Sequence, residues 1–102
     1  MSCVIRATTP TFKYTFATVN VANISQAYLT IAKNGTIVIE KSLADAYIGD
    51  GYLAWTLTQA ETLSVAAGTA SVMLNWLTRD GTRGASKETG LTFERNHKEV
   101  VI

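Results

Sequence analysis

The chain has 102 residues, the length of one domain with a single hydrophobic core. Nine Lys and Arg residues against eight Asp and Glu residues give a formal net charge of +1, and only 17% of residues are charged. This balance argues against nucleic acid as the main partner, because phosphate binding requires a clear excess of positive charge. The apolar content of 47% argues against disorder, and no apolar run is long enough to span a membrane.

The N-terminal sequence contains no apolar stretch of the kind that forms a secretion signal. Cys3 is the only cysteine, so the chain cannot form an internal disulfide. We therefore expect one domain over residues 1–102 that is stabilised by its core alone.

The dominant hydrophobic period is two, and turn dipeptides separate short runs of β-branched and aromatic residues. The first predicted strand places Phe12, Tyr14 and Phe16 on one side, which we expect to be buried. Pro10 lies just before this strand, where a missing N–H donor costs least.

The next two predicted strands form a β-hairpin. They cover residues 26–33 and 36–41, and we expect Ile37 and Ile39 to lie on one face of the second strand. Between them, the pair Asn34-Gly35 supplies the two positive φ angles that a type I′ turn requires.

Residues 44–51 are predicted to form a connection, and Leu53, Trp55 and Leu57 then alternate with other residues in a further half-buried strand.

A short helix near 59–66 follows, because Thr58 and Glu61 have the spacing of a capping box. We expect Ala60, Leu63 and Ala67 to form its apolar face and the helix to cross between two sheets.

The longest predicted strand covers residues 69–79 and is expected to be central, because both of its faces carry bulky side chains. Asp80-Gly81 then turns the chain, and Leu91 and Phe93 mark a last strand. The three C-terminal residues leave two readings open, namely a strand edge within the molecule or a contact with a neighbouring subunit. They are Val100, Val101 and Ile102.

These elements predict an all-β protein, specifically an antiparallel immunoglobulin-like β-sandwich of about seven strands with one short helix. A small barrel is the alternative. The Cys…Trp…Cys pattern of antibody domains is absent, so the prediction concerns architecture rather than ancestry.

Residues with the chemistry of a catalytic or metal site are scarce in the sequence. His97 is the only histidine and lies in the polar tail, where it is a poor general base for a catalytic triad. One Cys and one His cannot supply the four ligands of a structural zinc site. We therefore expect no enzymatic activity, no cofactor and no metal.

The segment Gly49-Asp50-Gly51-Tyr52-Leu53-Ala54 matches the letters of a dinucleotide-binding fingerprint. That fingerprint must open a helix so that the phosphate meets the helix N-terminus, whereas the residues that follow here alternate like a strand. We interpret the segment as a turn.

Tyr and Trp residues supply the candidate contact sites, because these side chains anchor interfaces as well as filling cores. Trp55 and Trp76 lie in apolar registers and are predicted to be in the core. Tyr28 and Tyr52 lie in the opposite registers and are predicted to make surface contacts, as is the apolar C-terminal tail.

Three stretches in succession resemble the immunoglobulin-like N-terminal module of phage baseplate upper proteins, and related small stand-alone proteins of phages and prophages of Gram-positive bacteria. They are Arg6-Ala7-Thr8-Thr9-Pro10-Thr11, Leu57-Thr58-Gln59-Ala60-Glu61-Thr62-Leu63, and residues 68–86 with Gly84-Ala85-Ser86. The resemblance spans nearly the whole chain. It implies a non-enzymatic virion protein, made in the host cytoplasm, that contacts other tail or baseplate proteins and often forms multimers.

The larger proteins of this kind continue into linking and host-binding regions where this sequence stops, so the resemblance favours a structural or adaptor role over receptor binding. Two alternatives stay open. One is a free effector that binds a host protein through a strand edge or loop. The other is a carbohydrate-binding sandwich that uses Tyr28 or Tyr52.

Overall fold

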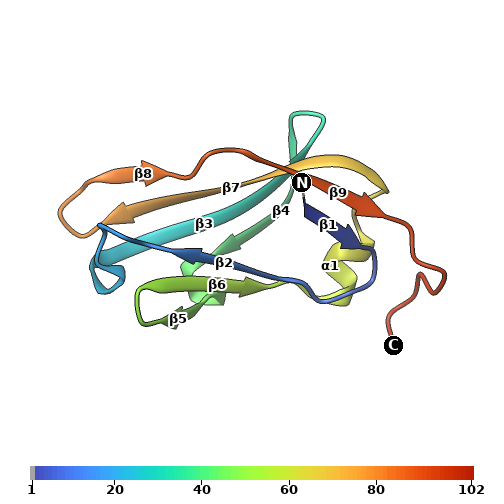
Figure 1. Ribbon diagram of the computed structural model, residues 1–102, viewed down its shortest axis with the longest axis horizontal. Helices are drawn as coiled ribbons and strands as arrows, with labels where there is room; N and C mark the ends of the chain where they lie inside the picture. Colours follow the sequence, from blue (N-terminus) through green and yellow to red (C-terminus); the bar gives the residue numbers. More distant parts are fainter. Residues whose placement is uncertain (1) are drawn as a thin grey trace.

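Two β-sheets pack face to face in the computed structural model, which describes residues 2–102 (Figure 1). The strands of the larger sheet are β1 (Ser2–Ile5), β3 (Ile24–Lys33), β4 (Thr36–Ser42), β7 (Gly68–Thr78), β8 (Arg83–Ala85) and β9 (Thr89–Glu94). Those of the smaller sheet are β2 (Thr11–Thr15), β5 (Tyr47–Gly49) and β6 (Tyr52–Thr56). The larger sheet has the order β1-β9-β7-β3-β4, with β8 on the same edge of β7 as β9, and the smaller has the order β2-β6-β5.

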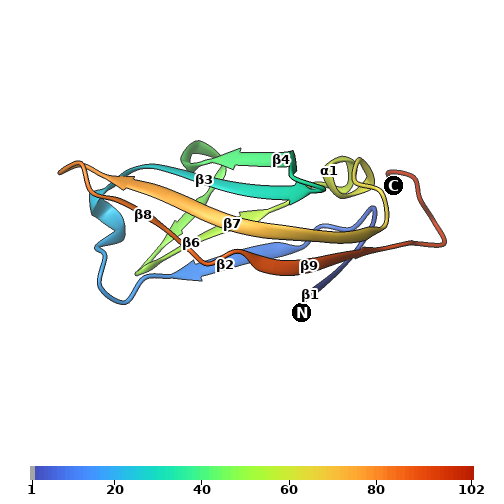
Figure 2. The same ribbon diagram turned by 90° about the horizontal axis from the view of Figure 1, so that it is seen from above.

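The strand order is that of an immunoglobulin-like sandwich, as the sequence predicted. The path β9-β7-β3-β4 corresponds to one sheet of that fold, and β2-β6-β5 corresponds to the other. The view from above shows β7 running almost the whole length of the molecule (Figure 2). It pairs with β3 on one side and with β8 and β9 on the other, which confirms its predicted central place.

One pairing departs from the expected antiparallel arrangement. Strand β1 runs parallel to β9, with Cys3 opposite Thr92 and Ile5 opposite Glu94. The parallel pair buries Val4 against the core, while its neighbours Cys3 and Ile5 point outward.

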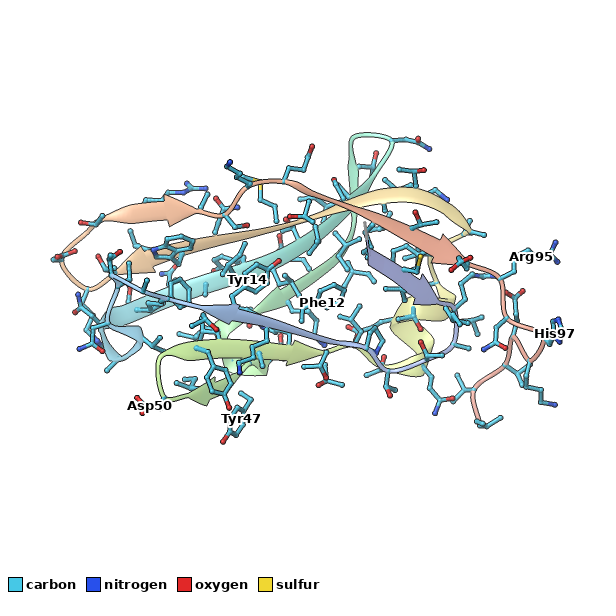
Figure 3. All side chains as sticks on the ribbon, viewed as in Figure 1. Phe12, Tyr14, Tyr47, Asp50, Arg95 and His97 are labelled. Atoms are coloured by element: carbon cyan, nitrogen blue, oxygen red, sulfur yellow. The ribbon has the colours of Figure 1, made fainter. Side chains whose placement is uncertain are left out.

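Side chains from the inward faces of both sheets form one core. Leu29 and Leu74 of the larger sheet and Leu53 and Trp55 of the smaller sheet are almost completely buried. The Trp55 indole N–H donates a 2.9 Å hydrogen bond to the Ser42 carbonyl oxygen, so the only polar atom of the ring is satisfied inside the core. Phe12, Tyr14 and Phe16 are half-buried and pack against this core, as predicted. Phe12 and Tyr14 are labelled in Figure 3.

The predicted hairpin is present, but its second strand carries a β-bulge. Asn34 and Gly35 have φ angles of 54° and 77°, which confirms the expected turn. Ile31 lies opposite Ile39 whereas Ala32 lies opposite Ile37, so one extra residue is inserted into β4. The prediction that Ile37 shares a face with Ile39 is therefore wrong, and 56% of Ile37 is exposed.

The capping box is confirmed and starts helix α1 (Gln59–Leu63), which joins the two sheets. The Thr58 hydroxyl accepts from the Glu61 N–H at 3.1 Å, and the Glu61 carboxylate accepts from the Thr58 N–H at 2.8 Å. The helix is shorter than the predicted 59–66, because it ends at Leu63 and Ser64, whose φ and ψ are still helical, forms its C-cap.

The predicted apolar face of this helix is wrong. Thr62 and Val65 are buried there, while Ala60 and Ala67 are exposed and Leu63 is half-buried. The orientation is fixed by a polar contact, because the Thr62 hydroxyl donates a 2.8 Å hydrogen bond to the Thr8 carbonyl oxygen.

Three short strands were not predicted, namely β1, β5 and β8. The sandwich therefore has nine strands rather than about seven. β5 lies inside the expected 44–51 connection, together with the 3₁₀ turn Leu43–Asp45. Another 3₁₀ turn, Val21–Asn23, precedes β3. The segment 49–54, which matches the letters of a dinucleotide-binding fingerprint, contains the turn between β5 and β6 and opens no helix.

Aromatic rings lie directly over two strand glycines. A Cβ atom on Gly84 would overlap the indole ring of Trp76, which lies opposite it on β7. A Cβ atom on Gly49 would likewise overlap the ring of Tyr52 on β6. Each aromatic side chain thus covers the backbone of its cross-strand partner, a pairing that fixes strand register.

We expect Gly84→Ala to destabilise the protein by about 1–3 kcal/mol, because the Trp76 ring must leave its position. Urea unfolding monitored by tryptophan fluorescence would measure the change. Ala85→Ser, at the exposed neighbouring position, is the control and should lie within about 0.5 kcal/mol of the wild type. Equal stability of the two variants would contradict the close packing.

An ion pair joins β4 to α1. The Lys41 ammonium lies 2.9 Å from the Glu61 carboxylate, and their side chains are 15% and 28% exposed. Burial alone raises the pKa of Glu61, but the Thr58 backbone N–H and the Lys41 ammonium outweigh it, so the pKa lies below its ordinary value of 4.5.

Because the folded state lowers the pKa of Glu61, the resulting stabilisation is complete above the unfolded pKa and is lost as the pH falls through the folded pKa. We expect the melting temperature of the wild type to fall below about pH 4.5 and the fall to be shallower in Glu61→Gln. Thermal melts between pH 7 and pH 3 would measure both. Parallel curves for the two proteins would contradict this contribution.

Candidate interaction surfaces

The two central strands of the larger sheet carry a continuous uncharged surface on their outward side. Four cross-strand pairs make up this surface, and we call it the neutral face. They are Gln26 with Leu77, Tyr28 with Asn75, Thr30 with Met73, and Ala32 with Ser71. The intervening residues of both strands point into the core, so the alternation of each strand directs the pairs outward.

One charged side chain flanks the neutral face on each side, and the exposed Ile37 lies beside it opposite Ala32. Glu40 lies opposite Thr30 on β4, and Arg83 lies opposite Leu77 on β8, both exposed. An uncharged centre with charged side chains at its margin is the composition of protein–protein interfaces, whose cores are depleted of charge.

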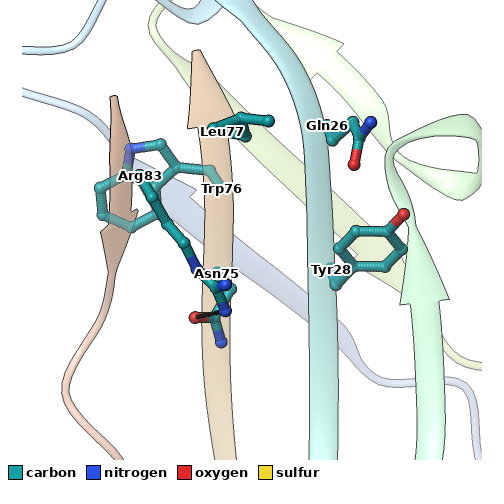
Figure 4. Close-up of a pocket in the computed structure, with 6 residues that line it drawn as sticks. All are labelled: Gln26, Tyr28, Asn75, Trp76, Leu77 and Arg83. Atoms are coloured by element: carbon teal, nitrogen blue, oxygen red, sulfur yellow. Dashed lines mark hydrogen bonds between the residues drawn. The ribbon is translucent and has the colours of Figure 1, made fainter. Parts of the chain in front are cut away.

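A shallow hollow of about 220 Å³ lies at one end of the neutral face. Figure 4 shows Tyr28 and Gln26 on β3 at one side of it and Arg83 on β8 at the other, with Asn75 and Leu77 between them. The Arg83 guanidinium donates to the Asn75 side-chain oxygen at 3.3 Å. Tyr28 is 40% exposed, so the structure places this predicted contact residue on the surface beside the hollow.

The outward side of the smaller sheet carries a second group of aromatic residues. The rings of Tyr47 and Tyr52 lie 6.0 Å apart between centroids, and the Lys13 ammonium lies 4.2 Å from the centroid of Tyr52. Tyr52, the other predicted contact residue, is half-buried between Gly49 and Lys13. Tyr47 is 66% exposed and projects from the lower edge of the molecule (Figure 3). Sequence reasoning missed Tyr47 because its strand was taken for a connection.

The C-terminal tail lies outside both sheets, but contacts attach it to the body of the protein. The Gln59 side-chain amide donates to the Ile102 carbonyl oxygen at 3.0 Å and accepts from the Ile102 N–H at 2.8 Å. The side chains of Val100, Val101 and Ile102 are 49%, 59% and 86% exposed. They form no strand edge, and their predicted contact with another subunit stays a prediction.

Arg6 joins three segments that are distant in sequence. Its guanidinium donates 2.7 Å hydrogen bonds to the carbonyl oxygens of Leu63 and Val65 at the end of α1, and lies 2.7 Å from the Glu99 carboxylate. The Asn96 side chain donates in turn to the Arg6 carbonyl oxygen. The Asn96 backbone N–H and Arg6 outweigh the opposing effect of desolvation and lower the pKa of Glu99.

The exposed acidic residues Asp80 and Asp45 have local hydrogen-bond partners. The Asp80 carboxylate accepts from the Thr78 hydroxyl and the Thr82 N–H, and that of Asp45 accepts from the Ser42 N–H. These hydrogen bonds lower the pKa of both carboxyls. His97 is exposed and points away from the body (Figure 3). A hydrogen bond to Glu94 raises the pKa of the exposed Cys3 thiol.

Within residues 2–102, no group of three or more His, Cys, Asp or Glu side chains is placed to hold a metal ion. No helix in this described part of the chain has the length and apolarity needed to cross a membrane.

Comparison with known proteins identifies similar folds but no family. The sequence matches no family model and no curated protein. The structure is similar to that of CopC from Methylosinus trichosporium OB3b, with a TM-score of 0.59, 16% identity, and coverage of 95% of this chain and 86% of that one. At this identity the likeness concerns the fold alone.

Two further similar structures give lower TM-scores. Domains 3–5 of Drosophila OTK give a TM-score of 0.39 at 12% identity, covering 93% of this chain and 32% of that one. The V domain of amphioxus IgVJ-C2 gives 0.37 at 13% identity, covering 91% and 98%. The strand order described above defines the chain as an immunoglobulin-like β-sandwich independently of them.

We expect Arg6→Ala to destabilise the protein by about 2–3 kcal/mol, because its charged hydrogen bonds to two carbonyl oxygens are lost. Hydrogen exchange of residues 96–102 should accelerate in the same variant, since Glu99 loses its ion-pair partner. Lys98→Ala is the control, as that side chain is exposed in the same tail. Unchanged exchange in Arg6→Ala would show that Arg6 does not hold the tail.

Proposed function

We propose that this protein is a non-enzymatic structural or adaptor component of a phage tail tip or baseplate, which acts through contacts with other virion proteins and with further copies of itself. The neutral face is the observation on which the proposal chiefly depends. Its eight uncharged side chains cover the two longest strands of the larger sheet, and they include the exposed ring of Tyr28. Tyr is among the side chains that contribute most to binding free energy at interfaces.

The order of the three sequence motifs supports a phage particle as the place where the protein acts. The stretches that resemble phage baseplate modules correspond to structural contacts here, because Arg6 binds the end of α1 and the capping box begins that helix. Rings and other closed assemblies repeat one weak contact many times, so a small β-sandwich with one large contact face is suited to them.

The Tyr47–Tyr52 pair supports carbohydrate binding as a second candidate function. An exposed aromatic ring can stack on the apolar face of a sugar, and Tyr47 presents such a ring beside that of Tyr52. Lys13 would add a positive charge next to it, which favours an acidic sugar.

Quantitative mass spectrometry of purified particles from the source strain tests the virion role. We expect the chain to be present, at a copy number that is a multiple of three or six relative to a tail component. Immunogold labelling with an antibody against the protein would then locate it at the tail tip.

Absence of the chain from intact particles would contradict the proposal. A stoichiometric complex with a host protein would then identify a free effector. Binding on a glycan array that is lost in Tyr47→Ala would identify a carbohydrate-binding protein, with the exposed Tyr28→Ala as the matched control.

A further inference from the structure

We propose that the free edge of β2 binds an extended, acidic segment of another protein, which adds to the smaller sheet as a strand antiparallel to β2. The inference builds on the proposed function, because the segment would belong to another protein of the virion. Four observations support it: the length and regularity of β2, the strand order of the fold, the direction of the backbone groups of β2, and the side chains that β2 carries.

Strand β2 is the longest regular edge strand of the sandwich. Five strands have a single neighbour among residues 2–102, namely β1, β2, β4, β5 and β8. β1 has four residues, β5 and β8 have three each, and β4 carries a bulge, a feature that hinders the addition of another strand. β2 has five residues, and its pairing with β6 has no irregularity. It is therefore the best template for a further strand.

The immunoglobulin-like fold has a place for a strand beside β2. In constant-type domains one sheet has the order A-B-E-D, so strand A pairs with strand B. By strand order, β2, β6 and β5 correspond to B, E and D. Strand β1 pairs with β9 in the other sheet instead, and β6 is the one strand that pairs with β2 among residues 2–102 (Figure 1). An added segment would take the position of strand A.

The backbone groups of alternate β2 residues point away from β6. The Pro10 carbonyl oxygen accepts from the Leu57 N–H, and the Phe16 N–H donates to the Gly51 carbonyl oxygen, both at 2.9 Å. In this register the even-numbered residues therefore bond to β6. The residues that direct their N–H and C=O groups to the free edge are Thr11, Lys13 and Thr15. An antiparallel strand pairs with this pattern of backbone groups.

The inward aromatic residues of β2 are incompletely covered. On the neighbouring strand β6, the inward side chains of Leu53 and Trp55 are 0% exposed. Phe12 and Tyr14 of β2, and Phe16 just after it, pack against the same core but remain half-buried. Alternate side chains of an added strand would lie on this inward side of the sheet and cover the rings. The added segment therefore needs apolar residues at alternate positions.

Lys13 determines what kind of segment the edge accepts. It is exposed at the centre of β2, its ammonium lies 4.2 Å from the centroid of the Tyr52 ring, and no carboxylate of residues 2–102 forms an ion pair with it. If two copies paired through the middle of β2 about a two-fold axis, Lys13 would lie opposite Lys13, and like charges in that position destabilise a strand pair. Asp or Glu in that position is favourable instead, so the edge suits an acidic segment of a different protein.

NMR titration with a synthetic peptide tests the site. The probe is the capped heptapeptide Val-Thr-Val-Glu-Val-Thr-Val, extended by Gly-Ser-Gly-Ser for solubility, whose Glu would lie opposite Lys13. In the free protein, the N–H groups of Thr11, Lys13 and Thr15 should exchange with solvent faster than those of Phe12 and Tyr14. The peptide should shift the signals of the first three and slow their exchange, with a dissociation constant on the order of 100 μM.

Backbone methylation and charge reversal provide the controls. The same peptide with an N-methyl group on its Glu cannot donate to the Lys13 carbonyl oxygen, and should bind at least about 10-fold more weakly. Lys13→Glu should weaken binding of the original peptide about 2- to 5-fold, and a peptide with Lys in place of Glu should restore it. Lys98→Glu makes the same charge change in the exposed tail and should leave the affinity unchanged. Thermal melts would show that both variants fold.

Absence of binding at about 1 mM peptide would overturn the inference, as would signal shifts confined to β4 or β5, or equal binding of the methylated peptide. Equal affinity for the Glu and Lys peptides would overturn the preference for an acidic segment. Protection of the same N–H groups that rises with the concentration of the protein alone would identify a second copy as the occupant, against the inference.

These outcomes are independent of the virion role. A protein that is present in particles but does not bind the peptide would leave the proposed function standing without the strand addition. A protein that binds the peptide but is absent from particles would leave only the strand addition.

Discussion

The burial of Trp55 between the two sheets is the interaction on which the rest of the sandwich depends. The ring comes from the middle strand of the smaller sheet and is fully buried, while its N–H bonds to the end of β4 in the larger sheet. It therefore joins the two layers through apolar contact and through one polar bond of fixed direction. Tyr14 meets the ring edge to face at 6.4 Å, so the neighbouring strand β2 is held to the same centre.

Local sequence signals predicted the elements that depend on a few neighbouring residues. The Asn34-Gly35 turn and the Thr58–Glu61 capping box belong to this class, because their hydrogen bonds and φ angles are set within four residues. The strand β7 could also be predicted, because buried and outward-facing residues alternate along most of its length.

Elements that depend on partners distant in the sequence could not be predicted from local signals. β1 is four residues long and is stabilised by a strand that lies almost at the other end of the sequence. The bulge in β4 is set by its pairing with β3, so a simple alternation misplaced Ile37. The buried face of α1 is the one that carries Thr62, whose hydroxyl donates a hydrogen bond to the segment before β2. This contact outweighs the apolar pattern of the helix itself. The alternation of β3 placed Tyr28 outward correctly, whereas the hollow beside it requires the register of β3, β7 and β8 together.

The parallel pairing of β1 with β9 also has a mechanical consequence. The two strands lie side by side and point the same way, and β1 enters the sheet near the start of β9 while the chain leaves from the end of β9 (Figure 1). Tension applied between Ser2 and the residues after Glu94 would therefore act along the strands in opposite directions, after the tail contacts of Arg6 had been pulled away. The hydrogen bonds between the strands would be strained together in shear rather than opened one at a time. Such a geometry resists stretching, because all of these bonds must break cooperatively before the two terminal strands separate.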